Sequence, residues 1–160
     1  MATPHTVKTF LDEKNVAYEI LTHPTAFTAQ EVAQAIHQTG KVLAKTIIVE
    51  HNGKIIMVVV PAHHKVDLKS LKTVLGVKDV HLAPEARLRE LFPESDLGAM
   101  PPLGLMYNLP VIISKALTEN PEIVFNACTH TDCVKMRYAD FENLVNPRVA
   151  DISDIPEEAR

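Results

Sequence analysis

Tryptophan is absent from the sequence and few other residues are aromatic, so aliphatic side chains have to fill the interior. The chain has 160 residues, with five Phe, three Tyr and no Trp. A chain of this length fits one domain and buries about two-thirds of the surface that it exposes when unfolded. It therefore needs no disulfide or metal to fold, and we expect a single domain over residues 1–146.

Cysteine is also scarce. Cys128 and Cys133 are too few and too close in sequence for a disulfide framework, which favours a reducing compartment. The longest apolar run, Ile55 to Ala62, is far shorter than the roughly 20 residues of a membrane helix. Residues 1–15 mix charged and apolar side chains, unlike a secretion signal. We expect a soluble, cytoplasmic protein with no membrane partner.

An excess of positive charge is missing as well. The formal net charge is −4, and because nucleic-acid-binding domains usually present a basic face, the total argues mildly against such a partner. The negative charge is concentrated at the C-terminus, where we expect residues 147–160 to form a frayed acidic tail. The rest of the chain is nearly neutral, so a local basic patch stays compatible with its composition.

Turn and capping residues divide the chain into helices and strands. Asn52-Gly53, between two apolar runs, predicts a hairpin with strands over 42–50 and 54–61. Asp67 is expected to cap a helix that ends at Gly76. Other helices are expected over 6–15, from 28 to about 36, over 84–92 and over 138–145, and other strands over 16–21, 77–83, 110–114, 122–126 and 133–137. This pattern predicts an α+β fold, a mixed β-sheet with helices around it.

Lys45 stands in the first strand of this hairpin, among apolar neighbours. Burying a lysine costs free energy unless its ammonium group reaches water or a cleft. The apolar run is nearly continuous, so alternation does not reveal the face that Lys45 occupies. Two interpretations stay open, a lysine that extends to the surface and a functional lysine at a cleft.

A loop rich in proline and glycine covers residues 93–109, and its centre reads Gly98-Ala99-Met100-Pro101-Pro102-Leu103-Gly104. Small residues let backbone amides approach a ligand closely, and prolines keep the loop rigid. Such amides could bind a carbonyl oxygen while negative charge develops on it. The alternative is an ordinary tight connection.

A polar segment, residues 126–133, separates two of the expected strands. Its Cys128, His130 and Cys133 could supply three zinc ligands, but their spacing matches no common structural site and a fourth ligand is missing. Cys128 and His130 could also form a nucleophile and its base. We assign no metal or cofactor. His63-His64 follows Pro61 in a loop, where we expect it to be exposed to solvent.

Several of these segments, in this order, resemble the YbaK family of prolyl-tRNA-synthetase-associated editing domains, which are trans-acting aminoacyl-tRNA deacylases. The resemblance covers residues 5–146. The segments that carry it are Thr28-Ala29-Gln30-Glu31-Val32-Ala33, Ala44-Lys45-Thr46, the loop Gly98 to Gly104, Thr129-His130-Thr131-Asp132 and Tyr138-Ala139-Asp140-Phe141. Each is weak alone, and together they are fairly specific.

The resemblance implies a mixed, partly curled sheet with helices around it, and hydrolysis of the ester between an amino acid and the 3′-terminal adenosine of tRNA. It implies a small non-cognate amino acid on tRNA-Pro, and no cofactor. Lys45 matches the family's functional lysine. The substrate-binding positions that it implies are Thr28 near the terminal nucleotide, Gly98, Ala99, Met100 and Pro101 in the loop, and His130 at the acyl pocket.

Other functions stay open beside this one. A non-catalytic module that binds aminoacyl-tRNA or a synthetase is the main alternative, although such a module has no need of Lys45 in a cleft. A third interpretation is a thiol- or zinc-dependent regulator centred on Cys128 and Cys133. Many family members have a glycine at the position of Cys128, so the preferred amino acid does not follow from the resemblance.

Overall fold

The computed structural model describes residues 4–24, 31–32, 34 and 41–156. Its helical elements are α1 (Pro4–Glu13), α3 (Leu68–Leu75), α4 (Glu85–Leu91), the 3-10 turn η1 (Gly104–Met106), α5 (Lys115–Thr118) and α6 (Tyr138–Val145). Its strands are β1 (Glu19–Thr22), β2 (Leu43–His51), β3 (Lys54–Pro61), β4 (Lys65–Val66), β5 (His81–Leu82), β6 (Val111–Ser114), β7 (Glu122–Asn126), β8 (Asp132–Arg137), β9 (Arg148–Ala150) and β10 (Ser153–Asp154). No helix in these ranges has the length and apolar character needed to cross a bilayer.

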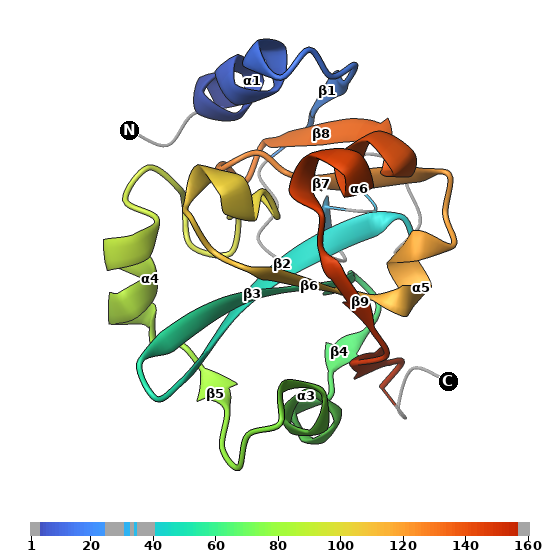
Figure 1. Cartoon of the computed structure of the whole chain (residues 1–160). Coiled ribbons are helices and arrows are strands. Elements are labelled where there is room, and N and C mark those ends of the chain that lie inside the picture. Colours follow the sequence, from blue (N-terminus) through green and yellow to red (C-terminus); the bar gives the residue numbers. More distant parts are fainter. Residues whose placement is uncertain (1–3, 25–30, 33, 35–40, 157–160) are drawn as a thin grey trace.

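One mixed sheet organises the molecule, as predicted. The strand order is β1-β8-β7-β2-β3-β6-β9, and helices lie around the sheet (Figure 1). The β2–β3, β7–β8 and β1–β8 pairs are antiparallel, whereas β2–β7, β3–β6 and β6–β9 are parallel. The predicted single-domain α+β fold is confirmed.

Local backbone chemistry explains the best-predicted elements. Asn52 and Gly53 both have positive φ, 48° and 76°, as a tight hairpin turn requires. The Asp67 carboxylate accepts hydrogen bonds from the amides of Lys69 and Ser70, and Gly76 ends α3 at φ 69°. These two predictions are confirmed.

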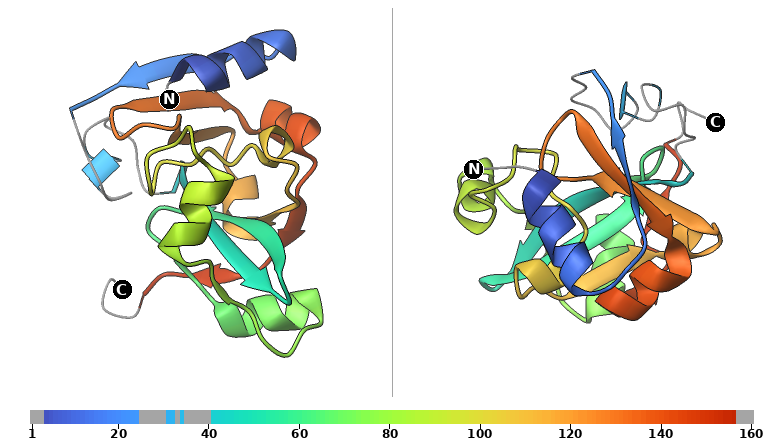
Figure 2. Two further views of the ribbon diagram at one scale, coloured as in Figure 1. Left: turned by 90° about the vertical axis from the view of Figure 1, so that its left-hand side faces the viewer. Right: turned by 90° about the horizontal axis from the view of Figure 1, so that it is seen from above.

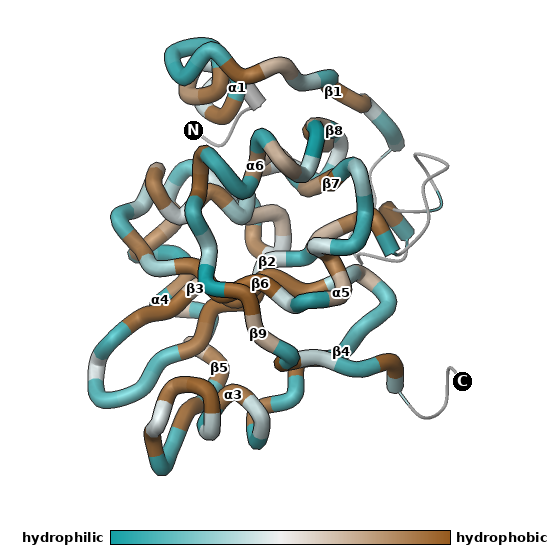
Figure 3. Tube along the Cα trace, turned by 45° about the vertical axis from the view of Figure 1, so that its right-hand side comes forward, coloured by the Kyte–Doolittle hydropathy of each residue, from teal (hydrophilic) through white to brown (hydrophobic). Residues whose placement is uncertain are grey.

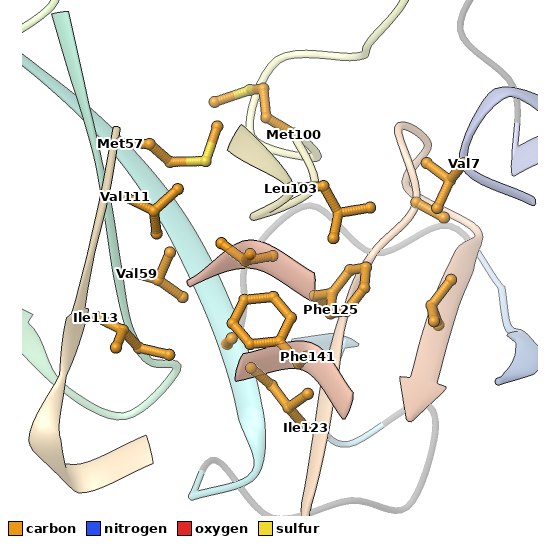
Figure 4. Close-up of a cluster of buried hydrophobic side chains, with 14 of the residues drawn as sticks. Val7, Met57, Val59, Met100, Leu103, Val111, Ile113, Ile123, Phe125 and Phe141 are labelled. Carbon is orange, nitrogen blue, oxygen red and sulfur yellow. The ribbon is translucent and has the colours of Figure 1, made fainter. Parts of the chain in front are cut away.

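The main core lies on one face of the sheet. Met57, Val59, Val111 and Ile113 from β3 and β6 face Leu103, Phe125 and Phe141 across it (Figure 4). On the opposite face, α3 packs Leu71 against Val49, Val58 and Val60. Figure 3 shows the apolar run of β3 and β6 through the middle of the molecule.

The edges of the sheet were predicted less well. The α1–β1 segment lies along β8 at one edge (Figure 2), and its strand begins at Glu19 rather than at residue 16. The strand predicted over 77–83 is reduced to β5. It pairs only with Val49 and Glu50 of β2, because β7 pairs with β2 only at the opposite end, Leu43 and Ala44.

The expectation of a frayed tail is wrong for residues 148–154. Strand β9 continues the sheet in parallel with β6, β10 pairs with β4, and Ile152 is fully buried. Strand β6 would otherwise be an edge, and the segment that covers it buries Ile152, whereas Val149 stays 42% exposed.

The same segment overturns a second expectation. His63 and His64 are half-buried instead of exposed. Strand β10 contacts the second of them, because the Nδ1 atom of His64 lies 2.8 Å from the Ser153 hydroxyl oxygen. Thr28, the expected cap of the helix that includes residues 31, 32 and 34, lies outside the described residues.

Candidate functional site

Lys45 points away from the main core. Ala44 and Ile48 are core residues, so alternation along β2 places Lys45 on the opposite face, together with Leu43 and Ile47. The lysine is half-buried there, and this burial lowers the pKa of its ammonium group. The structure thus resolves the ambiguity in the sequence: Lys45 lies on a face of the sheet that is only partly filled by apolar side chains.

Asn126 lies beside Lys45 on this face. Ala44 pairs with Phe125 in the parallel β2–β7 ladder, and Lys45 and Asn126 each follow by one residue. The Asn126 side chain is buried, with 8% exposure, and its amide nitrogen lies 3.5 Å from the carbonyl oxygen of Gly98. This contact links β7, the neighbour of the strand that carries Lys45, to the glycine loop, although the sequence analysis assigned no role to Asn126.

A buried histidine and cysteine complete this polar row. The Nδ1 atom of His23 lies 2.8 Å from the carbonyl oxygen of Pro24, and since that oxygen only accepts, Nδ1 carries the proton. The Nε2 atom lies 3.6 Å from the sulfur of Cys133, whose single thiol proton is directed to the Asn126 carbonyl oxygen at 3.6 Å. Burial raises the pKa of the Cys133 thiol to about 12, so this pair does not form a thiolate nucleophile at neutral pH.

The glycine loop is fastened to the polar segment by backbone hydrogen bonds at residue 128. Asp96 N–H donates to Cys128 O at 2.9 Å, and Cys128 N–H donates to Ala99 O at 2.9 Å. Cys128 adopts φ 71° and Gly98 φ 83°, both left-handed. This double bridge brings Gly98 to the histidine of the polar segment, because a Cβ atom added at Gly98 would lie 3.7 Å from His130 Cε1.

The predicted loop residues divide into two groups. Gly98 is exposed in the bridged turn, whereas Ala99, Met100 and Pro101 are buried, and Met100 packs in the main core. His130 instead lines an open pocket of 840 Å³, together with Phe92, Asp96 and Leu97. Gly98 and His130 therefore come together at one place, and Asn126 contacts Gly98 from β7, the neighbour of the strand that carries Lys45.

The zinc and Cys128-nucleophile interpretations gain no support. The Cys128 sulfur faces the Tyr107 hydroxyl at 3.8 Å, and burial raises the pKa of its thiol. Cys133 turns instead toward His23 and Asn126. Within the described ranges, no group of three or more His, Cys, Asp or Glu side chains could hold a metal ion.

Comparison with known proteins identifies the family of the chain. The sequence profile of the aminoacyl-tRNA editing domain matches residues 23–144. The prolyl-tRNA editing protein ProX of Acetoanaerobium sticklandii is 23% identical over 141 residues, covering 84% of this chain and 85% of that protein. Proline–tRNA ligase of Bacillus mycoides is 24% identical over 136 residues, which cover 85% of this chain but 22% of the ligase. This chain thus spans about a fifth of the ligase's length.

The fold is shared with solved structures. The crystal structure of a candidate trans-editing enzyme for prolyl-tRNA synthetase superposes with a TM-score of 0.84 at 21% identity, covering 94% of this chain and 96% of that one. At this identity the likeness concerns the fold. The profile match covers three-quarters of the chain and includes Lys45, the glycine loop and His130, and the chain therefore belongs to the aminoacyl-tRNA editing domain family.

Proposed function

We propose that this protein hydrolyses the ester that joins a wrongly attached, small amino acid to the 3′-terminal adenosine of tRNA, with tRNA-Pro as the substrate. The observation that supports the proposal is the contact of Asn126 with the bridged loop at Gly98, because Asn126 and Lys45 each follow by one residue the paired residues Phe125 and Ala44 of neighbouring strands. We assign this cation and the loop with left-handed backbone to one site. The names of the relatives, prolyl-tRNA editing protein and proline–tRNA ligase, support the choice of tRNA.

The chemistry needs positioning more than a strong nucleophile, because an aminoacyl ester is already activated. A water molecule adds to the acyl carbon, the bond from that carbon to the ribose oxygen breaks, and a proton passes to the departing ribose oxygen. The ribose hydroxyl next to the ester is suited to orient this water. Lys45, a compact and mobile cation, holds the ribose-phosphate end.

The loop supplies the site for negative charge on the acyl oxygen. Ala99 N–H donates to Asp96 O and is therefore engaged within the loop. The N–H of Gly98 has no partner among the described residues. We assign this amide to the developing oxyanion, which a fixed donor stabilises more in the transition state than in the ground state.

The proposed reaction also requires a pocket for the amino acid and a location where aminoacyl-tRNA occurs. His130 beside Gly98 forms one wall, so larger amino acids are excluded by size. Met100 and Pro101 support the loop from the core side. The substrate places the protein in the cytoplasm, in association with aminoacyl-tRNA and with prolyl-tRNA synthetase.

The test is a deacylation panel with alanyl-, seryl-, cysteinyl- and prolyl-tRNA. We expect hydrolysis of at least one small mischarged amino acid and none of prolyl-tRNA. Lys45→Ala should abolish hydrolysis with the fold intact, because a half-buried ammonium group contributes little to stability. Lys54→Ala, at the far end of the same hairpin, is the matched control and should retain the wild-type rate.

Two results would contradict the proposal. A folded Lys45→Ala variant with the wild-type rate would remove Lys45 from the site. If the wild-type protein binds aminoacyl-tRNA tightly but cleaves no member of the panel, the chain is the non-catalytic binding module instead.

A further inference from the structure

Two buried serine hydroxyl groups form a row of hydrogen bonds that ends at His64. The proposed reaction uses none of these residues. The Ser114 and Ser153 hydroxyl oxygens lie 2.8 Å apart, and Ser153 lies 2.8 Å from His64 Nδ1. Ser114 is 1% exposed and Ser153 is 9% exposed. These hydrogen bonds join β6, β10 and the turn after β3. Buried polar contacts between such distant segments require an explanation.

Only one donor-to-acceptor direction of these hydrogen bonds gives every hydroxyl proton an acceptor. If Ser114 donates to Ser153 and Ser153 donates to His64, both protons have acceptors. In the reverse direction the Ser114 proton has no acceptor among the described residues. The first direction makes Nδ1 of His64 the acceptor, so Nε2 carries the proton and is the ring nitrogen left for a ligand.

The surroundings keep this imidazole neutral. Burial lowers the pKa of His64 first, and the nearby His63 and Lys45 lower it further, while Asp154 and Asp151 act in the opposite direction. At neutral pH the ring is therefore an uncharged donor. The effect of Lys45 also shows that His64 lies within electrostatic reach of the candidate lysine.

His64 lines an open pocket of 320 Å³, which we call the histidine pocket. Its polar lining consists of Lys41, His63, His64, Glu119 and Asn120. The Asn120 side-chain amide donates a hydrogen bond to the carbonyl oxygen of Lys41 at 2.8 Å. This bond fixes the side of the pocket that these two residues form. The pocket thus combines an exposed cation, Lys41, with a neutral N–H donor of fixed tautomer, within electrostatic reach of Lys45.

A phosphodiester group suits this combination. Its oxygens only accept hydrogen bonds, and its single negative charge is complementary to Lys41, the lysine of the pocket lining. We propose that the histidine pocket binds a backbone phosphate of the RNA strand that leads to the aminoacylated end, with His64 as a neutral donor oriented by Ser153 and Ser114. This inference rests on the proposed function in taking tRNA as the ligand.

Two substitutions separate the donor from its anchor. His64→Asn keeps a group near the position of Nδ1, and with it the bond from Ser153, but removes the donor at Nε2. His64→Gln keeps a donor near Nε2 and loses the anchor. With deacylated tRNA as the probe, we expect His64→Asn to weaken binding about tenfold, or about 1.4 kcal/mol, and His64→Gln to stay within about threefold of wild type.

Coupling and salt dependence sharpen the test. Ser153→Ala, which removes the anchor but keeps the donor, should weaken binding in the wild-type protein by no more than about threefold and add no further loss to His64→Asn, because both changes act through the same donor. Lys41→Gln should reduce the slope of log K against log salt by about 0.7, the value for one phosphate of a single strand. His64→Asn should leave that slope unchanged, and the control Lys54→Gln should change neither affinity nor slope.

Binding of deacylated tRNA does not require ester hydrolysis, so the two proposals fail separately. If the protein binds tRNA as described but deacylates nothing, the histidine pocket stands and the proposed reaction does not. If His64→Asn binds like the wild type, or if the wild type binds no tRNA even at low salt, the pocket proposal is overturned whatever the deacylation result.

Discussion

Gly98→Ala separates the function of the glycine loop from its contribution to stability. Gly98 has φ +83°, and an added Cβ would meet His130 Cε1 at 3.7 Å, an ordinary contact distance. The cost is therefore conformational and not steric. A left-handed backbone costs an L-residue roughly 1 to 2 kcal/mol, while the less flexible unfolded chain of alanine returns roughly 0.4 to 1 kcal/mol.

The net loss is about 1 kcal/mol, which lowers the Tm of a domain of this size by about 2 to 4 °C. Gly76→Ala is the matched control, since Gly76 has φ +69° and open space around its built Cβ, at the end of α3. Both variants should lose similar stability. Only Gly98→Ala should turn the Gly98 amide away from the acyl oxygen, at a cost of about 100-fold or more in kcat.

The assay combines urea unfolding with single-turnover hydrolysis of the best substrate in the panel, using fully folded protein. If Gly98→Ala reduces the rate no more than Gly76→Ala, the loop does not bind the oxyanion. A rate loss with unchanged stability would refute the backbone argument, because the strain at φ +83° would then carry no cost.

Two further predictions concern selectivity and acid stability. His130→Ala should relax selection by acyl size, raising the rate on prolyl-tRNA relative to alanyl-tRNA about tenfold, because His130 bounds the pocket beside Gly98; equal losses on every substrate would point to catalysis or structure instead. Hydrogen bonds from the side chain and backbone of Ser70 lower the pKa of Asp67 below its usual 3.8. The ionised cap therefore stabilises the fold above the unfolded-state pKa and is lost as pH falls through the folded-state pKa. Asp67→Ala should cost about 1 kcal/mol at pH 7, and urea unfolding should show this difference shrinking in acid; a constant difference would contradict the assignment.

Elements with their own chemical signals were predictable from the sequence. The hairpin at Asn52-Gly53 and the α3 helix between Asp67 and Gly76 depend on interactions within a few residues, and both formed as expected. Short edge elements such as β5 and β9 carry little local signal, because their pairing depends on which positions of β2 and β6 stay open.

The site residues show the same division. Lys45, Gly98 and His130 could be singled out from residue type, order and family resemblance. Asn126 and His64 could not, because nothing near them in sequence indicates their partners. Asn126 reaches Gly98, 28 residues away, and His64 reaches Ser153, 89 residues away.

The sequence by itself determined the class of fold, the turn and cap positions, the family and the identity of the candidate lysine, since these follow from local backbone preferences and from residues in a fixed order. Only the tertiary structure decided which face of β2 carries Lys45, that Met100 packs in the core, that residues 148–150 extend the sheet, and that Ser153 anchors His64. These outcomes depend on contacts between distant segments. Such contacts form where apolar surface and buried hydrogen-bonding groups can both be satisfied, and that condition is set by the whole fold.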